Sequence, residues 1–251
     1  MKHFFQSLCT VSALSLSAVT ADAASLTITN ISGVWDSWTG GTAVTTGNSG
    51  STAQLRWGIP TDGGKSGYDF TPTTTPTTEA AHTPFTLGTF THLNYPIQAG
   101  SAITSATLTV VFDFFLGSDS STVYQRSSTF VFDHWETGNS DRPCANGGTV
   151  GVGVNVNGCA DRVVASTNPA LTETFTVVEG DTTSTYVFAV DGFDIGDQFW
   201  TKENQSNTAS LKAQFTYESV IQPAPVPLPA AAWMLVAGLG ALGVAGRRRR
   251  T

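Results

Sequence analysis

Two pairs of polar residues could act together because the members of each pair are two positions apart. His92 and Asn94 form one pair, and His134 and Glu136 form the other. Residues two apart in a β-strand project from the same face, so each pair would present its side chains together. If the two segments meet in the fold, two imidazoles, an amide and a carboxylate come together.

Three kinds of chemistry fit these side chains. His92, His134 and Glu136 could ligate a metal ion, and Glu136 could act as the base of a hydrolytic site. The third alternative is a structural network, in which the polar groups hydrogen-bond one another or loop backbone and so avoid the cost of unpaired burial. We favour the network, and we therefore expect no catalytic residue, no metal site and no cofactor.

A second acidic group follows an apolar run that ends at Val190. Asp191, Asp194 and Asp197 are interspersed with two glycines, and their carboxylate oxygens could bind calcium. The alternating acid-rich loop of an EF-hand is absent from this segment. We interpret it as a solvated turn and keep the three aspartates only as calcium candidates.

The elements that would position these side chains are β-strands. Apolar and polar residues alternate with a period of two in eight segments, which are 26–29, 54–57, 106–114, 128–133, 150–156, 173–178, 184–190 and 211–217. Gly, Asn, Asp and Pro separate them, and no helical pattern lies between. The pattern predicts one all-β domain over residues 24–221, an antiparallel β-sandwich of the jelly-roll kind, with an up-and-down barrel as the alternative.

The N-terminal segment has the features of an export signal. Lys2 precedes an apolar stretch over residues 8–19, and Ala21 and Ala23 are small residues at the spacing that signal peptidase requires. The apolar stretch is too short to span a bilayer. Residues 1–23 are therefore predicted to be a signal peptide that signal peptidase removes, so that the mature protein is exported.

Of the three cysteines, Cys9 would be lost with the signal peptide. Cys144 and Cys159 would then lie in an oxidising compartment, where a disulfide is the usual outcome. Their spacing lacks the paired short-range ligands of a zinc knuckle. We predict a bridge between Cys144 and Cys159, which stabilises the fold by about 3 kcal/mol in the chain-entropy model.

Residues 222–251 have the composition of a membrane-anchored tail. An uncharged apolar run over 228–246 would, as a helix rising about 1.5 Å per residue, reach roughly 28 Å, close to the hydrocarbon thickness of a bilayer. A proline-rich segment stands before or at the start of this run, and an arginine cluster follows it: Val226, Pro227, Leu228 and Pro229, then Arg247, Arg248, Arg249 and Arg250. The arginines would hold the C-terminal end of a transmembrane helix in the cytoplasm and leave the domain outside.

This order resembles the PEP-CTERM sorting signal, in the variant headed by VPLPA that is typical of some Gram-negative bacteria. The resemblance implies that an exosortase in the inner membrane recognises the proline-rich segment and separates the domain from the arginine tail. It also implies a transient anchor in the inner membrane, followed by a location at the cell surface or outside the cell.

A second resemblance lies within the domain. It rests on Thr91, His92, Asn94, Pro96 and Ile97 in one segment and on His134, Glu136, Thr137 and Asn139 in another. These residues resemble the THxN and HxETPN segments of the THxN family of PEP-CTERM proteins, with Gly138 where proline is more usual, and residues 157–161 fit the family pattern as well. The resemblance implies a β-rich exported domain with this type of tail and implies no activity.

Charge limits the partners of the mature domain. Without Lys2, Asp22 and the four terminal arginines, seven Lys and Arg and eighteen Asp and Glu remain, for a formal charge of −11. Such a surface repels nucleic acid and anionic lipid headgroups, so we expect no nucleic-acid partner. Charged residues make up 12% of the chain, about half the usual share, which suits an extracellular β-protein.

We therefore expect a non-catalytic structural or interaction protein of the cell surface or the extracellular polysaccharide matrix, with exopolysaccharide as a candidate partner. One alternative is a carbohydrate-binding module, which would align several Trp or Tyr rings on an exposed face. Another is a secreted hydrolase, which would need paired carboxylates or an activated nucleophile in a cleft.

Overall fold

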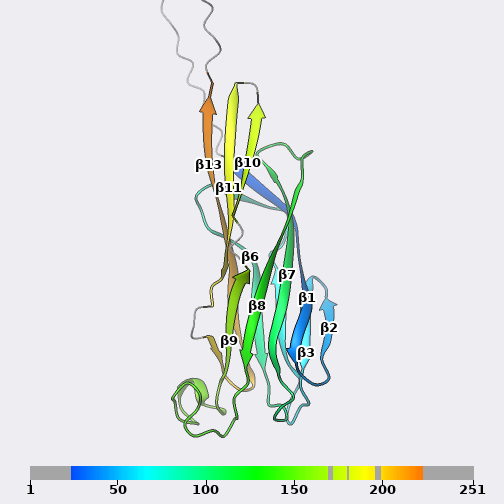
Figure 1. Cartoon of the computed structure of the whole chain (residues 1–251), viewed down its shortest axis with the longest axis vertical. Coiled ribbons are helices and arrows are strands. Elements are labelled where there is room, and N and C mark those ends of the chain that lie inside the picture. Colours follow the sequence, from blue (N-terminus) through cyan, green and yellow to red (C-terminus); the bar gives the residue numbers. More distant parts are fainter. Residues whose placement is uncertain (1–23, 169–171, 180, 196–198, 223–251) are drawn as a thin grey trace, which may run out of the picture.

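The computed structural model describes residues 24–168, 172–179, 181–195 and 199–222, and its strands run along one elongated body (Figure 1). These residues form thirteen strands and a short 3-10 helix: β1 Ser25–Gly40, β2 Thr45–Ser49, β3 Thr52–Trp57, β4 Ser66–Pro72, β5 Thr77–Ala80, β6 Phe85–Asn94, β7 Ile103–Leu116, β8 Tyr124–Trp135, η1 Gly153–Asn155, β9 Asp161–Asn168, β10 Thr172–Glu179, β11 Thr182–Phe193, β12 Phe199–Thr201 and β13 Gln205–Ile221.

The strands form two antiparallel sheets that pack face to face. One sheet has the order β12-β9-β8-β7-β1-β5, and the other has the order β10-β11-β13-β6-β4-β3-β2. The predicted all-β sandwich is confirmed at this level. The jelly-roll expectation fits only as far as two facing antiparallel sheets, because the described part of the chain has thirteen strands rather than eight and places β7, β8 and β9 side by side in chain order.

The alternating sequence pattern becomes an alternating burial pattern. On β7 every second side chain from Ala106 to Leu116 is buried between the sheets, and the side chains between them are half-buried. Phe90 of β6 stacks on Phe132 of β8 with 4.5 Å between ring centroids, so the contact joins one sheet to the other. Burying each such ring stabilises the fold by about 1.5–3 kcal/mol, which makes the aromatic layer the main attraction between the sheets.

One predicted strand is wrong. Residues 150–156 are not extended but contain η1, in the loop between the two cysteines. Gly151 and Gly153 have φ values of +89° and +59°, in the left-handed region that a strand does not use. Val152 is 65% exposed, so it faces no core. Valine and glycine alternate in this segment. The period of two resembles that of a strand, but glycine has no side chain and so the segment has no polar face.

The two predicted signals lie outside the described residues. These are the signal peptide 1–23 and the tail with Val226, Pro227, Leu228, Pro229 and the arginines 247–250. Within the residues that are described, no helix has the length and apolar character needed to cross a bilayer. The last strand, β13, stays paired up to Ile221, which lies opposite Thr182 of β11.

One end of the sandwich gathers the residues that the sequence singled out. There β6 ends at Asn94, β8 ends at Trp135, and β9 begins at Asp161. In register, Thr201 at the end of β12 lies opposite Asp161. Figure 1 shows this end at the bottom of the view, beside the loop that carries η1. The strand ends of both sheets therefore surround one small region of the core.

Candidate functional site

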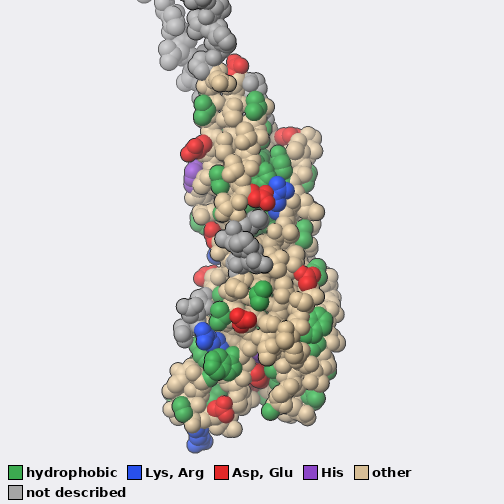
Figure 2. Space-filling model, in the orientation of Figure 1, with side chains coloured by type: hydrophobic (Ala, Val, Ile, Leu, Met, Phe, Trp, Pro, Cys, Tyr) green, Lys and Arg blue, Asp and Glu red, His purple; other side chains and the backbone are tan. Residues whose placement is uncertain are grey.

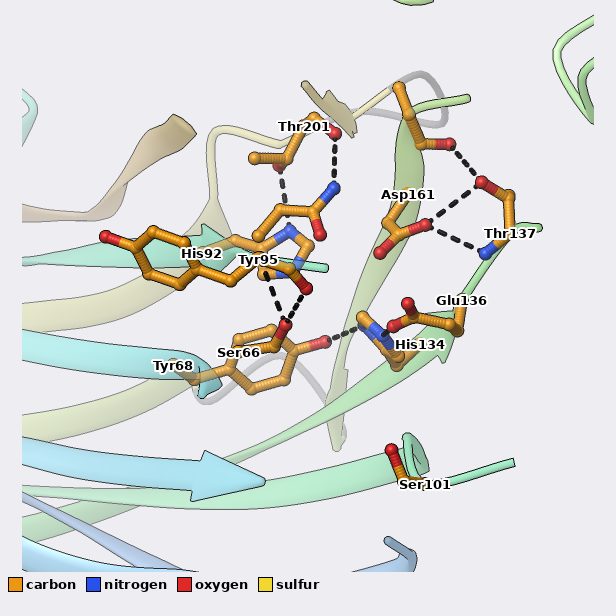
Figure 3. Close-up of polar contacts among 12 residues, drawn as sticks. Ser66, Tyr68, His92, Tyr95, Ser101, His134, Glu136, Thr137, Asp161 and Thr201 are labelled. Atoms are coloured by element: carbon orange, nitrogen blue, oxygen red, sulfur yellow. Dashed lines mark hydrogen bonds and ion pairs between the residues drawn. The ribbon is translucent and has the colours of Figure 1, made fainter. Parts of the chain in front are cut away.

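His92 and Asn94 point inward from β6, as their spacing predicts, and both are fully buried. Both bind the same residue of the opposite sheet. The His92 Nδ1 lies 2.8 Å from the Thr201 hydroxyl, and the Asn94 amide donates to the Thr201 carbonyl oxygen at 2.9 Å. Figure 3 shows these two contacts side by side. Thr201 thus ties the end of β12 to β6.

His134 and Glu136 also project together, which confirms the second predicted pair. The His134 Nε2 lies 3.4 Å from a Glu136 carboxylate oxygen. The other ring nitrogen, Nδ1, shares a hydrogen bond of 2.9 Å with the Tyr68 hydroxyl from β4 (Figure 3). His92 and His134 come from different sheets and meet edge to face, with 5.3 Å between ring centroids. The two segments do not pair as strands but face each other across the core.

Asp161 is the acidic residue that completes this region. One of its carboxylate oxygens, Oδ1, accepts hydrogen bonds from the Thr137 backbone N–H at 2.8 Å and from the Thr137 hydroxyl at 3.1 Å. The same hydroxyl lies 3.1 Å from the carbonyl oxygens of Cys159 and Ala160. Thr137 therefore fixes the chain after β8 against the start of β9, and it orients the Asp161 side chain.

Several buried polar atoms of this region make no hydrogen bond of ordinary length and angle in the described part of the chain. These atoms are His92 Nε2, Asn94 Oδ1, Asn139 Oδ1, Asp161 Oδ2 and both carboxylate oxygens of Glu203. Looser side-chain hydrogen bonds link Glu203 to Asn94 and Asn139, and Glu136 to Asp161. Most buried polar groups in proteins are hydrogen-bonded, so such a concentration at one place needs an explanation.

Burial dominates the pKa values of the three carboxyl groups. It raises the pKa of Glu136 to about 7, against a side-chain hydrogen bond to Asp161 that lowers this pKa, and the charge of Glu203 adds to the rise. The pKa of Asp161 is raised by burial and then by the Glu136 carboxylate. Burial also raises the pKa of Glu203, against the effect of the nearby Asn94 and Asn139 amides. Each group is harder to ionise because its charge would be buried beside others of the same sign.

The two histidines show the opposite effect. Burial lowers the pKa of His134 to about 4, against the attraction of the Asp161 carboxylate. Burial and the neighbouring His134 lower the pKa of His92 well below its usual value. The pKa of Tyr68 is raised well above its usual value by burial and then by the Asp161 charge. At pH 7 the region thus combines neutral imidazoles and a neutral phenol with carboxyl groups that lack a compensating charge.

The predicted disulfide is confirmed, and it lies beside this region. Cys144 and Cys159 are bonded, with 5.3 Å between their Cα atoms. The Cys159 N–H donates to the Asn139 carbonyl oxygen at 3.3 Å. The bridge therefore closes the loop that brings Asn139 and Asp161 to the end of the sandwich.

The other residues of the two motif segments have packing roles. Thr91 is half-buried on β6. The Pro96 carbonyl accepts from the Thr61 N–H at 3.0 Å, and the Ile97 side chain packs where a Cβ on Gly58 would be 2.6 Å away. Gly58 also has a φ of +91°, so glycine is required here both for the backbone conformation and for the close approach of Ile97.

The calcium candidates lie away from this cluster. Asp191 is exposed on β11, where its carboxylate lies 3.5 Å from the Gln214 amide nitrogen, and Asp194 is exposed after the strand. Asp197 lies outside the described residues. Where the structure describes them, these aspartates are solvent-facing, and the cation site among them stays a prediction.

Tyr68, Thr201 and Glu203 are site residues that sequence reasoning missed. A signal for two of them is present in residues 199–203, where Phe199, Thr201 and Glu203 are buried and the residues between them are half-buried. When every second residue of a segment is buried and some of these buried residues are polar, the segment is a strand that contributes to a buried polar cluster.

Comparison with known proteins gives a match at the C-terminus. Residues 225–250 match the PEP-CTERM protein-sorting motif. The match covers about a tenth of the chain and lies outside the described residues. No curated protein matches the chain. The motif marks the protein for export and for processing by an exosortase, with a location at the cell surface or outside the cell.

Proposed function

We propose that this protein is a non-catalytic structural or interaction module, which an exosortase releases at Val226-Pro227-Leu228-Pro229 to the cell surface or the extracellular polysaccharide matrix. The observation that carries the proposal is where the sorting motif begins. The sandwich ends with the paired residue Ile221, and the matched motif starts at residue 225. Cleavage within the motif would therefore free the sandwich without breaking a strand pair.

Burial of the polar cluster supports a non-catalytic role. His92 and Asn94 are inaccessible to solvent, and one polar atom of each side chain is hydrogen-bonded to Thr201. A polysaccharide chain cannot reach these atoms without opening the sandwich. We expect no release of reducing ends when the purified protein is incubated with matrix polysaccharide. Release that disappears in Glu136→Gln would contradict this expectation and support a hydrolase.

The sorting step is tested by mass spectrometry of the protein secreted from cells with and without the exosortase. The secreted form should lack Arg247–Arg250, and the uncut chain should accumulate in the inner membrane when the exosortase is absent. Pro227→Ala should reduce cleavage, whereas Pro223→Ala, outside the matched residues, should not. A secreted species that retains the arginines would refute the proposal.

Replacing Arg247–Arg250 by serine provides a second test of the tail. The positive charges resist translocation, so their loss should weaken retention and orientation in the membrane before cleavage. The measurement is protease accessibility of the C-terminus in intact spheroplasts.

Carbohydrate binding is a second candidate, because three side chains form a row on the outer face of one sheet. Trp135 of β8 lies opposite Arg162 of β9, and Arg162 lies opposite Trp200 of β12. Directly opposite residues of antiparallel strands share a face. Trp135 is 55% exposed, and the Arg162 guanidinium lies 6.0 Å from the Trp200 ring centroid. Aromatic rings beside a planar cation suit the apolar and hydroxyl faces of a sugar.

The visible face of the molecule is compatible with an uncharged polymer. Figure 2 shows few acidic and basic side chains, spread over the face and in one place adjacent to each other, among larger areas of other polar groups and backbone. Trp135→Ala should weaken co-sedimentation with exopolysaccharide, whereas Trp38→Ala, a partly exposed tryptophan on β1, should not. Equal binding by both variants would show that the row of Trp135, Arg162 and Trp200 does not bind the polysaccharide, and the structural role would then be the better proposal.

A further inference from the structure

His134, Glu136 and Asp161 converge at the end of the sandwich where the two histidines meet. Each offers one ligand atom, and the three atoms lie within 4.8 Å of one another. We propose that these residues bind a divalent first-row transition cation, such as zinc, which holds the end of β8 to the start of β9. The proposal is independent of how the protein is sorted.

One pair of ligand atoms already has the spacing of a metal site. Two ligands of a tetrahedral zinc ion, each at about 2.1 Å, lie about 3.4 Å apart. The His134 Nε2 and the Glu136 carboxylate oxygen are separated by 3.4 Å. Figure 3 shows the side chains of His134, Glu136 and Asp161 on the same side of the region. The Asp161 carboxylate oxygen lies within 4.8 Å of both other ligand atoms, so a small shift of its side chain would complete the set.

Two of the three ligands, His134 and Asp161, are each oriented by a second residue. When His134 is protonated on Nδ1, it donates to the Tyr68 oxygen, and the lone pair on Nε2 is then directed toward Glu136. Asp161 is fully buried and holds Thr137 through Oδ1, and no N–H or hydroxyl donor occupies its Oδ2 in the described part of the chain. Histidines and carboxylates that bind a metal are commonly oriented by hydrogen bonds to their atoms that do not contact the metal.

The crowding of carboxyl groups around Asp161 is a second sign of a cation, since Glu136 is the one side chain close to its Oδ2 side that interacts with it and carries the same charge when ionised. A buried polar atom with no partner costs about 1–3 kcal/mol, and a buried unpaired carboxylate costs more. Glu203, also fully buried, adds a third carboxyl group in the same region, and its side chain interacts with the neutral amides of Asn94 and Asn139 rather than with a cation. Among the described residues, the two Lys or Arg ion pairs join Arg56 to Asp69 and Arg126 to Glu173, away from these carboxylates.

The donor set selects the class of cation. One imidazole nitrogen with two carboxylates suits zinc, manganese or iron, whereas calcium and magnesium take oxygen ligands almost entirely. The disulfide removes both mature cysteines from the possible ligands. His92 is also outside the set, although the sequence offered it as a ligand, because it does not belong to the group of ligand atoms that lie within 4.8 Å of one another.

The test measures Zn²⁺ binding by isothermal titration calorimetry to the full-length chain, purified in detergent and stripped with EDTA. We expect one Zn²⁺ per wild-type chain. Glu136→Gln and Asp161→Asn should each weaken binding at least about tenfold, the lower limit seen even for outer-shell changes. Asp133→Asn should bind like wild type, because this exposed carboxylate lies on the same strand and faces the other way.

Two further measurements keep the proposal falsifiable. The Glu136 side chain is 20% exposed, whereas Asp161 is fully buried, so Glu136→Gln should fold even if Asp161→Asn does not, and near-ultraviolet circular dichroism verifies this. His82→Gln removes an exposed imidazole and controls for adventitious binding. Absence of Zn²⁺ binding by the wild type, or equal affinity of wild type and folded Glu136→Gln, would overturn the proposal. Loss of binding in His82→Gln alone would overturn it as well.

Discussion

Thr201→Val removes one hydroxyl from the polar cluster and should destabilise the fold measurably. The Thr201 side chain is 1% exposed, and its hydroxyl is the partner of His92 Nδ1 at 2.8 Å. Valine has nearly the same shape, and the backbone carbonyl that binds Asn94 stays in place. The substitution therefore isolates one hydrogen bond, and it leaves a fully buried imidazole with neither nitrogen paired.

The size of the effect follows from the unpaired nitrogen. A buried group that loses its partner costs about 1–3 kcal/mol in free energy of unfolding. Since 1 kcal/mol shifts the melting temperature of a domain of this size by about 2–4 °C, we expect a decrease of roughly 2–12 °C. Replacing both partners with apolar groups removes the penalty. His92→Leu combined with Thr201→Val should therefore lose less stability than the two single variants together.

The assay is reversible urea denaturation of the full-length chain in EDTA, so that bound cations do not contribute. Thr208→Val serves as a control, because this threonine is exposed on β13. An unchanged free energy of unfolding in Thr201→Val would refute the structural role of the His92 hydrogen bond. Strict additivity of the His92 and Thr201 substitutions would refute it too, because coupled residues deviate from additivity.

Two further substitutions test the framework around the site. Cys144→Ser opens a loop that spans 15 residues, and it should lower the free energy of unfolding by about 3 kcal/mol in urea denaturation; equal stability of variant and wild type under oxidising conditions would contradict this. Phe132→Ala removes a fully buried ring that stacks on Phe90 across the two sheets, and it should cost about 3–5 kcal/mol. A loss below about 1 kcal/mol in the same assay would mean that this contact does not hold the sheets together.

Most long strands were predictable because alternation is a local property of the chain. The patterns at 106–114, 128–133 and 184–190 fall within β7, β8 and β11. The cysteine pair was predictable for a chemical reason, since only two cysteines lie within the predicted domain. The segment 150–156 misled because glycine provides neither a polar nor an apolar side chain.

Strand β6 escaped prediction although it carries the most informative motif. Its buried face includes His92 and Asn94, so apolar residues do not alternate at its end. A search for period-two hydrophobicity fails wherever polar residues are buried. The same residues that make the segment chemically interesting therefore hide the strand that holds them.

Local spacing was enough to place His92 beside Asn94, and His134 beside Glu136, because neighbours two apart share a face. It could not bring the two pairs together or supply their partners. His92 meets Thr201 across 109 positions of sequence, and His134 meets Tyr68 across 66. Contacts at such separations depend on strand order, on register and on how two sheets pack. Whether a cluster of polar residues is a hydrogen-bonded network or a cation site is therefore a property of the folded sandwich.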